Sequence, residues 1–252
     1  MKELFDFAVE LAERAGENIL KYYRNSIQVD TKPDDSPVTI ADRTTEELIR
    51  NEIEKRFPDD GILGEEFGEK PGRSPFRWIL DPIDGTKTFI RGVPFYGTLI
   101  AVEREGKSVI GVIRFPAMKE TLAAMTGFGC FVNGDRCRVS GTATVASAAV
   151  MTTAFNDFLA ARGEKPLLRL LRETALQRTW ADCYGYLLVA AGRVDAAFDT
   201  NAKIWDVAPL IPIIQEAGGR ITSLDGESTL AITSMLATNG LIHDALMQLL
   251  QG

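Results

Sequence analysis

The chain has 252 residues, which fits one or two domains. Its 28 basic residues against 35 acidic ones give a net charge of −7, and this balance disfavours a nucleic-acid partner, which needs a basic surface. The single histidine, His243, excludes metal sites that need two histidines. The three cysteines form no CxxC pair, which indicates a reducing compartment.

The first twenty residues carry Glu3, Asp6, Glu10 and Glu13, whereas a secretory signal needs a basic start and an uncharged apolar stretch. No run approaches the roughly 18 apolar residues that cross a bilayer. We therefore expect a cytoplasmic protein without a membrane partner.

The first part of the chain predicts two helices. Apolar residues at three- and four-residue spacing favour a helix over 4–24, and a second helix is expected over 40–56. Between them, the polar segment 31–37 contains two prolines and is expected to form an irregular loop.

Strands are predicted next. Residues 77–80 indicate a short buried strand that stops at Asp81-Pro82, and 95–114 indicates a hairpin split by the polar residues 104–107. Strand-like sequence continues to about residue 139.

The second half alternates between the two kinds of element. Strands are expected at 148–153 and 194–198, and helices at 167–175, 184–191, 204–217 and 241–250. Gly218-Gly219 ends the third of these helices, and His243 is expected at the surface of the last.

This order of helices and strands indicates an α+β layered fold. Since no linker separates the halves, we expect a single catalytic domain (1–252) with lobes at roughly 1–140 and 141–252 and the site between them.

Acidic residues stand at the end of the predicted strand 77–80. In the segment Asp81-Pro82-Ile83-Asp84-Gly85-Thr86, Pro82 cannot continue the strand ladder and Gly85 permits a tight turn, which would place Asp81 and Asp84 on one side. Two carboxylates this close repel unless a cation lies between them, and Mg²⁺ takes such oxygen ligands, with the Ile83 carbonyl as a further one. A turn with solvated acids is an equal alternative for this segment alone.

Two other segments favour the metal site. Glu65, in Gly64-Glu65-Glu66, follows a short apolar stretch, and Asp206 begins an apolar helix, where it could be only an N-cap. For either segment alone, a purely structural role of its acid is a better explanation than metal binding. Together with Asp81 and Asp84, they supply the four acids that a site for two or three metal ions requires.

The segment Gly85-Thr86 could contribute a phosphate-binding site next to the metal ions. If a helix starts at Gly85-Thr86, its free backbone amides would face a phosphate group. The Thr86 hydroxyl could also orient a water molecule.

With these motifs the chain resembles the lithium-sensitive, Mg²⁺-dependent phosphatases of the inositol monophosphatase and fructose-1,6-bisphosphatase superfamily. The matching segments occur in the expected order and span essentially the whole chain. They are Gly64-Glu65-Glu66, Asp81-Pro82-Ile83-Asp84-Gly85-Thr86-Lys87-Thr88-Phe89, Trp205-Asp206-Val207-Ala208 and Glu216-Ala217-Gly218-Gly219. The resemblance implies a layered αβαβα sandwich and a homodimer.

The resemblance also implies a metal-ligand set. Glu65, Asp81 and the Ile83 carbonyl would bind one Mg²⁺, and Asp81, Asp84 and Asp206 a second, with a weaker third ion near Glu65. Mn²⁺ is a possible substitute. Two such cations neutralise the repulsion between a phosphate dianion and hydroxide, and they lower the pKa of a bound water.

By the same resemblance, Thr86 and Glu65 would position and activate the water, with Asp42 supporting Thr86. The amides of Gly85 and Thr86 would hold phosphate oxygens. The expected reaction is direct in-line attack by water on a small-molecule phosphate monoester.

The segments 89–100 and 178–186 resemble the histidinol-phosphatase branch, except that Ala181 stands where that branch usually carries glycine. L-Histidinol phosphate is therefore the leading substrate. Its amine and imidazole would contact Asp182 and Asp199, although a helix N-cap and a strand end are the structural alternatives for these two. Lys32 is expected to be a solvated loop lysine, with an approach to the site through its loop as the alternative.

Two other functions stay open. Inositol 1-phosphate, or a broad range of sugar phosphates, is the alternative substrate. A catalytically silent phosphate- or metal-binding interaction protein is the alternative of another class.

Overall fold

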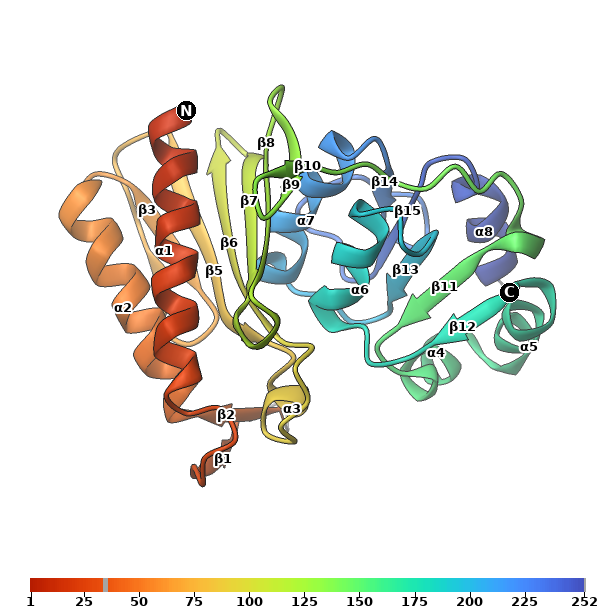
Figure 1. The fold of residues 1–252 in the computed structure, drawn as a ribbon, viewed down its shortest axis with the longest axis horizontal. Helices are drawn as coiled ribbons and strands as arrows, with labels where there is room; N and C mark the ends of the chain where they lie inside the picture. The colour runs from red at the N-terminus through yellow and green to blue at the C-terminus, as the bar shows by residue number, and fades with distance from the viewer. Residues whose placement is uncertain (34–35, 252) are drawn as a thin grey trace.

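The computed structural model of the chain describes residues 1–33 and 36–251. Helices and sheets alternate in five layers, helix, sheet, helix, sheet, helix, along the long axis of the molecule (Figure 1). The predicted αβαβα sandwich is confirmed. Within the described part of the chain, no helix has the length and apolar character needed to cross a membrane.

The large sheet has the strand order β10-β9-β8-β7-β6-β5-β3-β4 and is antiparallel except between β3 and β5. Its strands are β3 (Gly61–Gly64), β4 (Gly68–Lys70), β5 (Phe76–Asp84), β6 (Gly97–Arg104), β7 (Lys107–Phe115), β8 (Glu120–Met125), β9 (Gly129–Val132) and β10 (Asp135–Arg136). The hairpin predicted over 95–114 is confirmed as β6 and β7. Helices α1 (Lys2–Leu20) and α2 (Ile40–Arg56) cover its outer face through a shared apolar core.

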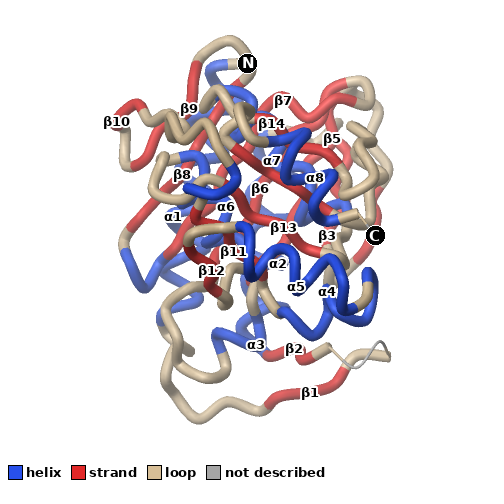
Figure 2. The backbone as a smooth tube through the Cα atoms, turned by 90° about the vertical axis from the view of Figure 1, so that its right-hand side faces the viewer, coloured by secondary structure: helices blue, strands red, loops and turns tan. Residues whose placement is uncertain are grey.

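The small sheet has the order β12-β11-β13-β15-β14. Its strands are β11 (Ala149–Thr152), β12 (Leu176–Arg178), β13 (Ala196–Asp199), β14 (Arg220–Thr222) and β15 (Met235–Thr238). Its outer face carries α4 (Phe155–Arg162), α5 (Glu164–Glu173) and α8 (His243–Leu250), which face the viewer in Figure 2. Helices α6 (Asp182–Ala190) and α7 (Ile204–Glu216) fill the layer between the sheets.

The segment between α1 and α2 differs from its prediction. Helix α1 ends at Leu20, not near residue 24, and the expected irregular loop is flanked by the short paired strands β1 (Val29–Thr31) and β2 (Pro37–Thr39). Pro37 is tolerated because it is the first residue of its strand. Residues 34–35 of the predicted loop lie outside the described residues. The β1–β2 hairpin lies beside α3 (Thr86–Phe89), at the lower end of both views (Figures 1 and 2).

Helix α7 belongs to the second half of the chain but packs on the large sheet. Its two prolines leave helix carbonyls without their usual amide donors, and one of these, the Ala208 carbonyl, accepts a hydrogen bond from the Ser108 hydroxyl of β7 at 2.6 Å. At Gly111 the strand approaches so closely that a Cβ atom would lie 2.0 Å from the Pro209 carbonyl oxygen. The close approach holds the start of α7 near the end of β5.

His243 is buried, so its predicted surface position is wrong. Its two ring nitrogens lie 3.0 Å from the hydroxyls of Thr222 and Thr238 on the two paired strands β14 and β15. Burial, with a smaller effect of Arg220, lowers the pKa of His243 to about 4. The last helix therefore begins with a neutral imidazole in the core.

We predict that Gly111→Ala lowers the free energy of unfolding by about 1–3 kcal/mol, because the added methyl group must displace the backbone of α7. Denaturant unfolding measures the change. Gly141→Ala is the matched control, since a Cβ there meets no atom within 4 Å and its effect should stay within about 0.5 kcal/mol. Equal stability of the two variants would contradict the packing described for α7.

We predict that His243 makes the protein less stable as the pH falls from 6.5 to 4. The folded-state pKa of about 4 lies below the unfolded value, so the unfolded chain binds the proton first; the contribution is complete above pH 6.5 and is lost toward pH 4. The loss amounts to about 3 kcal/mol. His243→Gln, which removes the only histidine, should flatten the stability curve over this range. Parallel curves for both proteins would refute the assignment.

Candidate active site

Asp81 and Asp84 lie on the same face of β5 because the strand carries a β-bulge between them. Asp81 pairs with Leu99 of β6 and Asp84 with Gly97, so three steps along β5 oppose two along β6. Residues three apart in a regular strand point to opposite faces, and the extra residue turns Asp84 back to the face of Asp81. The strand predicted to stop at Asp81 therefore continues to Asp84, with Pro82 accommodated inside the bulge.

Asp206 joins this pair from the first turn of α7. Its Oδ2 accepts a hydrogen bond from the Lys203 amide at 2.8 Å and so caps the N-terminus of the helix. One carboxylate oxygen from each of Asp81, Asp84 and Asp206 lies within 4.8 Å of the others. A helix-capping role and a place in this three-carboxylate cluster thus coexist in Asp206.

The three-carboxylate cluster is electrostatically costly as it stands. Burial first, and then neighbouring acids, raise the pKa of Asp81 and of Asp84 well above the usual range and the pKa of Asp206 to about 7. Oδ1 of Asp81 is buried and has no hydrogen-bond partner among the described residues. Buried, crowded carboxylate oxygens with one unsatisfied acceptor fit a divalent cation that takes oxygen ligands.

Thr86 lies at the start of the short helix α3, next to this cluster in sequence. Its hydroxyl donates a hydrogen bond to the Ile83 carbonyl at 3.0 Å and lies 3.3 Å from Oδ1 of Asp42. The other carboxylate oxygen of Asp42 accepts hydrogen bonds from the Thr39 amide at 2.8 Å and hydroxyl at 2.6 Å, closing the capping box of α2. Burial raises the pKa of Asp42.

Glu65 follows β3 and lies close enough to the cluster for its charge to raise the pKa of both Asp81 and Asp206. Its Oε1 accepts from Lys32 Nζ at 2.7 Å, and Lys32 also contacts Oε1 of Glu66 at 2.6 Å. The prediction of a solvated Lys32 is therefore wrong: its side chain is only 18% exposed, because the β1–β2 hairpin brings its ammonium to two acids. In spite of that contact, burial raises the pKa of Glu66 to about 7.

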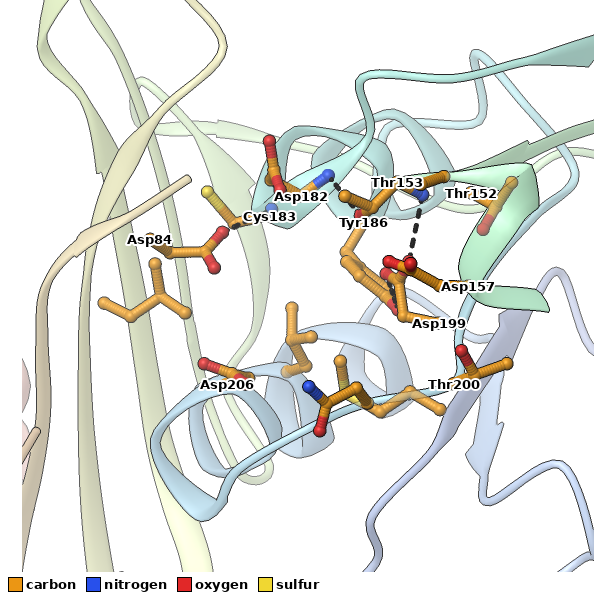
Figure 3. A pocket seen from close by; sticks show the side chains of 15 residues that line it. Asp84, Thr152, Thr153, Asp157, Asp182, Cys183, Tyr186, Asp199, Thr200 and Asp206 are labelled. Atoms are coloured by element: carbon orange, nitrogen blue, oxygen red, sulfur yellow. Dashed lines mark hydrogen bonds between the residues drawn. The ribbon is translucent and has the colours of Figure 1, made fainter. Parts of the chain in front are cut away.

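A cavity of about 130 Å³ opens between the cluster and the small sheet. In Figure 3, Asp84 and Asp206 stand on one side of this pocket and Asp199 on the other. Asp182 lies at the start of α6, where its Oδ2 accepts from the Thr88 hydroxyl at 2.7 Å and so does not cap its own helix.

Asp199 ends β13, and both its oxygens are engaged. They accept hydrogen bonds from the Thr153 amide at 2.9 Å and the Tyr186 hydroxyl at 2.8 Å (Figure 3). Burial raises the pKa of Asp199 to about 6. Asp199 thus presents a carboxylate of fixed orientation to the cavity.

Sequence reasoning missed the wall of the pocket formed by residues 152–157. Thr153 and Asp157 line the cavity from the end of β11 and the start of α4 (Figure 3). Asn201 also lines it. Helix α4 was not predicted, since it is only 8 residues long and its large apolar residues span little more than one turn. The threonine pair at the end of the predicted strand 148–153 was the only available signal.

Comparison with known proteins agrees with this geometry. A model of the inositol monophosphatase family matches residues 1–252. A histidinol-phosphatase of Chlorobaculum parvum is 46% identical over 240 residues, covering 92% of this chain and 93% of that protein. A histidinol-phosphatase of Mycobacterium tuberculosis is 38% identical over 246 residues, covering 95% of each. The solved IMPase of Thermotoga maritima matches with a TM-score of 0.91 and 33% identity, over 99% of this chain and 97% of that one.

The fold and these matches define a phosphomonoesterase of the layered αβαβα type. The chain belongs to the inositol monophosphatase family. Phosphatases of this family depend in general on Mg²⁺, which agrees with the chemistry of the three-carboxylate cluster.

We predict that Asp206→Asn stabilises the metal-free protein by about 1–2 kcal/mol, because it removes one of three crowded, mutually repelling carboxylates while keeping an oxygen for the Lys203 amide. The same change should abolish the rise in melting temperature that Mg²⁺ causes in the wild type. Asp135→Asn, an equal charge change on the exposed strand β10, serves as control. Undiminished stabilisation of Asp206→Asn by Mg²⁺ would show that the cluster is not the metal site.

Proposed function

We propose that this phosphatase is Mg²⁺-dependent, hydrolyses a small-molecule phosphate monoester by direct attack of water, and has L-histidinol phosphate as its leading substrate. One observation supports the metal dependence above all. Asp81, Asp84 and Asp206 converge in a buried place where an oxygen of Asp81 has no partner among the described residues.

The proposed ligands are the carboxylates of Glu65, Asp81, Asp84 and Asp206 and the Ile83 carbonyl, for two or three ions. Mn²⁺ is proposed as a substitute. When bound, the ions supply Lewis-acid charge that offsets the phosphate dianion and lowers the pKa of water.

Thr86 and Glu65 are proposed to position and activate the attacking water. Because the single hydroxyl proton of Thr86 is donated to the Ile83 carbonyl or to Asp42, the lone pairs of its oxygen can accept a hydrogen bond from water. Glu65 then takes up the proton of the water. Asp42 keeps Thr86 in this orientation, since α2 itself holds its carboxylate.

The phosphate oxygens are proposed to contact the amides of Gly85 and Thr86, and the leaving group to contact Asp182 and Asp199. An amine and an imidazole would meet acceptors there, which supports L-histidinol phosphate. The histidinol-phosphatase relatives at 46% and 38% identity support the same substrate and a role in histidine biosynthesis.

We further propose a cytoplasmic homodimer of single-domain subunits, with lobes at roughly 1–140 and 141–252. Both lobes contribute residues to the pocket. The three cysteines are free, which supports a reducing compartment. Inositol 1-phosphate remains the alternative substrate, supported by the IMPase structure that this chain resembles.

We predict that phosphate release requires Mg²⁺ and has its highest kcat/KM with L-histidinol phosphate. The measurement compares this substrate with inositol 1-phosphate, fructose 1,6-bisphosphate and adenosine 3′,5′-bisphosphate, each with Mg²⁺ and with a chelator. Equal turnover of all four would reject the substrate assignment. No turnover of any, with Mg²⁺ bound, would favour the silent binding protein.

A further inference from the structure

Helix α2 buries a second acid one turn after Asp42. The Glu46 side chain is 0% exposed, which is unusual for a glutamate unless it is paired. Its partners are Arg50, whose Nε lies 2.8 Å from Oε1, and two backbone amides, those of Glu66 at 2.7 Å from Oε2 and of Phe67 at 3.2 Å from Oε1. Glu46 therefore binds the backbone directly after Glu65.

The turn formed by residues 64–68 leaves room for the Glu46 carboxylate. A Cβ atom at Gly64 would lie 2.0 Å from Oε1 of Glu46, so only glycine lets the acid reach the amides. Arg50 also donates a hydrogen bond to the Gly68 carbonyl at the other end of the turn. The Glu46–Arg50 pair thus holds both ends of residues 64–68.

Asp42 and Glu46 are four residues apart and so lie on one face of α2. Asp42 contacts Thr86, while Glu46 fixes the turn that carries Glu65. Helix α2 therefore contacts both segments that carry the proposed water-activating side chains, Thr86 and Glu65.

We propose that Glu46 is a positioning residue for the metal site: it fixes the 64–68 turn so that the Glu65 carboxylate keeps its place beside the three-carboxylate cluster. The inference rests on the proposed function, in which Glu65 is a metal ligand. It predicts an effect on Mg²⁺ affinity, whereas a purely structural role for Glu46 predicts an effect on stability alone.

The test compares Glu46→Gln with Glu47→Gln, its exposed neighbour on the same helix. The glutamine can still accept one amide, but its NH₂ group faces the other donor and Arg50. We expect Glu46→Gln to weaken Mg²⁺ binding, measured by calorimetry, about 10- to 100-fold, as for other groups that orient a ligand. Amide hydrogen exchange at Glu66 and Phe67 should accelerate, and high Mg²⁺ should restore most of kcat. Glu47→Gln should match the wild type.

Gly64→Ala provides a second test with Glu46 intact, because the added methyl group pushes the carboxylate off the two amides. This variant should weaken Mg²⁺ binding in the same way. If Glu46→Gln does not fold, Gly64→Ala still tests whether Glu46 positions the metal site. Wild-type Mg²⁺ affinity in a folded Glu46→Gln or Gly64→Ala variant would overturn the inference and leave the proposed function standing. Absence of Mg²⁺ binding by the wild-type chain would instead overturn the proposed function, and the inference with it.

Discussion

The mutual repulsion of three crowded carboxylates, one buried and two half-buried, is the constraint to which the rest of the structure responds. Asp81 and Asp84 reach one face through a bulge, and Asp206 joins them from the far half of the chain. Asp206 reaches the other two acids only if α7 packs closely on the large sheet. Gly111 allows this close approach because it has no side chain, and the Ser108 hydroxyl supports it with a hydrogen bond to α7. Such packing works against the charge repulsion, so the fold maintains a site that a cation would stabilise.

The two halves of the chain are also joined by hydrogen bonds at the site itself. The Cys183 amide of α6 donates to Oδ2 of Asp84 at 2.6 Å, and Thr88 donates to Asp182. Both bonds link the β5–α3 segment to the start of one helix. A shift of α6 would therefore move Asp84, a proposed metal ligand, and Asp182, a proposed substrate contact, together.

The sequence was informative where local chemistry decides the structure. Helix α2 begins and ends where predicted because its capping residues and apolar spacing are local signals. The predictions from sequence failed where partners far away in the chain decide whether a side chain is buried. Lys32 and His243 were both assigned to solvent, yet one pairs with acids 33 and 34 residues away and the other is enclosed by two strands of the small sheet. Glu46 gave no signal either, since an acid in a polar helix is expected to be exposed until the turn that it binds is in place.

The acidic pocket bears on the choice between a cationic and a neutral leaving group. Asp182 and Asp199 both line the cavity, and burial raises the pKa of each, so a positive charge placed beside them would stabilise their ionised forms. An amine or imidazolium would supply that charge next to carboxylates already oriented by Thr88, Thr153 and Tyr186. A neutral polyol could only donate hydrogen bonds to these carboxylates and would bring no positive charge to offset the cost of burying them. This argument supports the proposal of histidinol phosphate, rather than inositol phosphate, as the substrate.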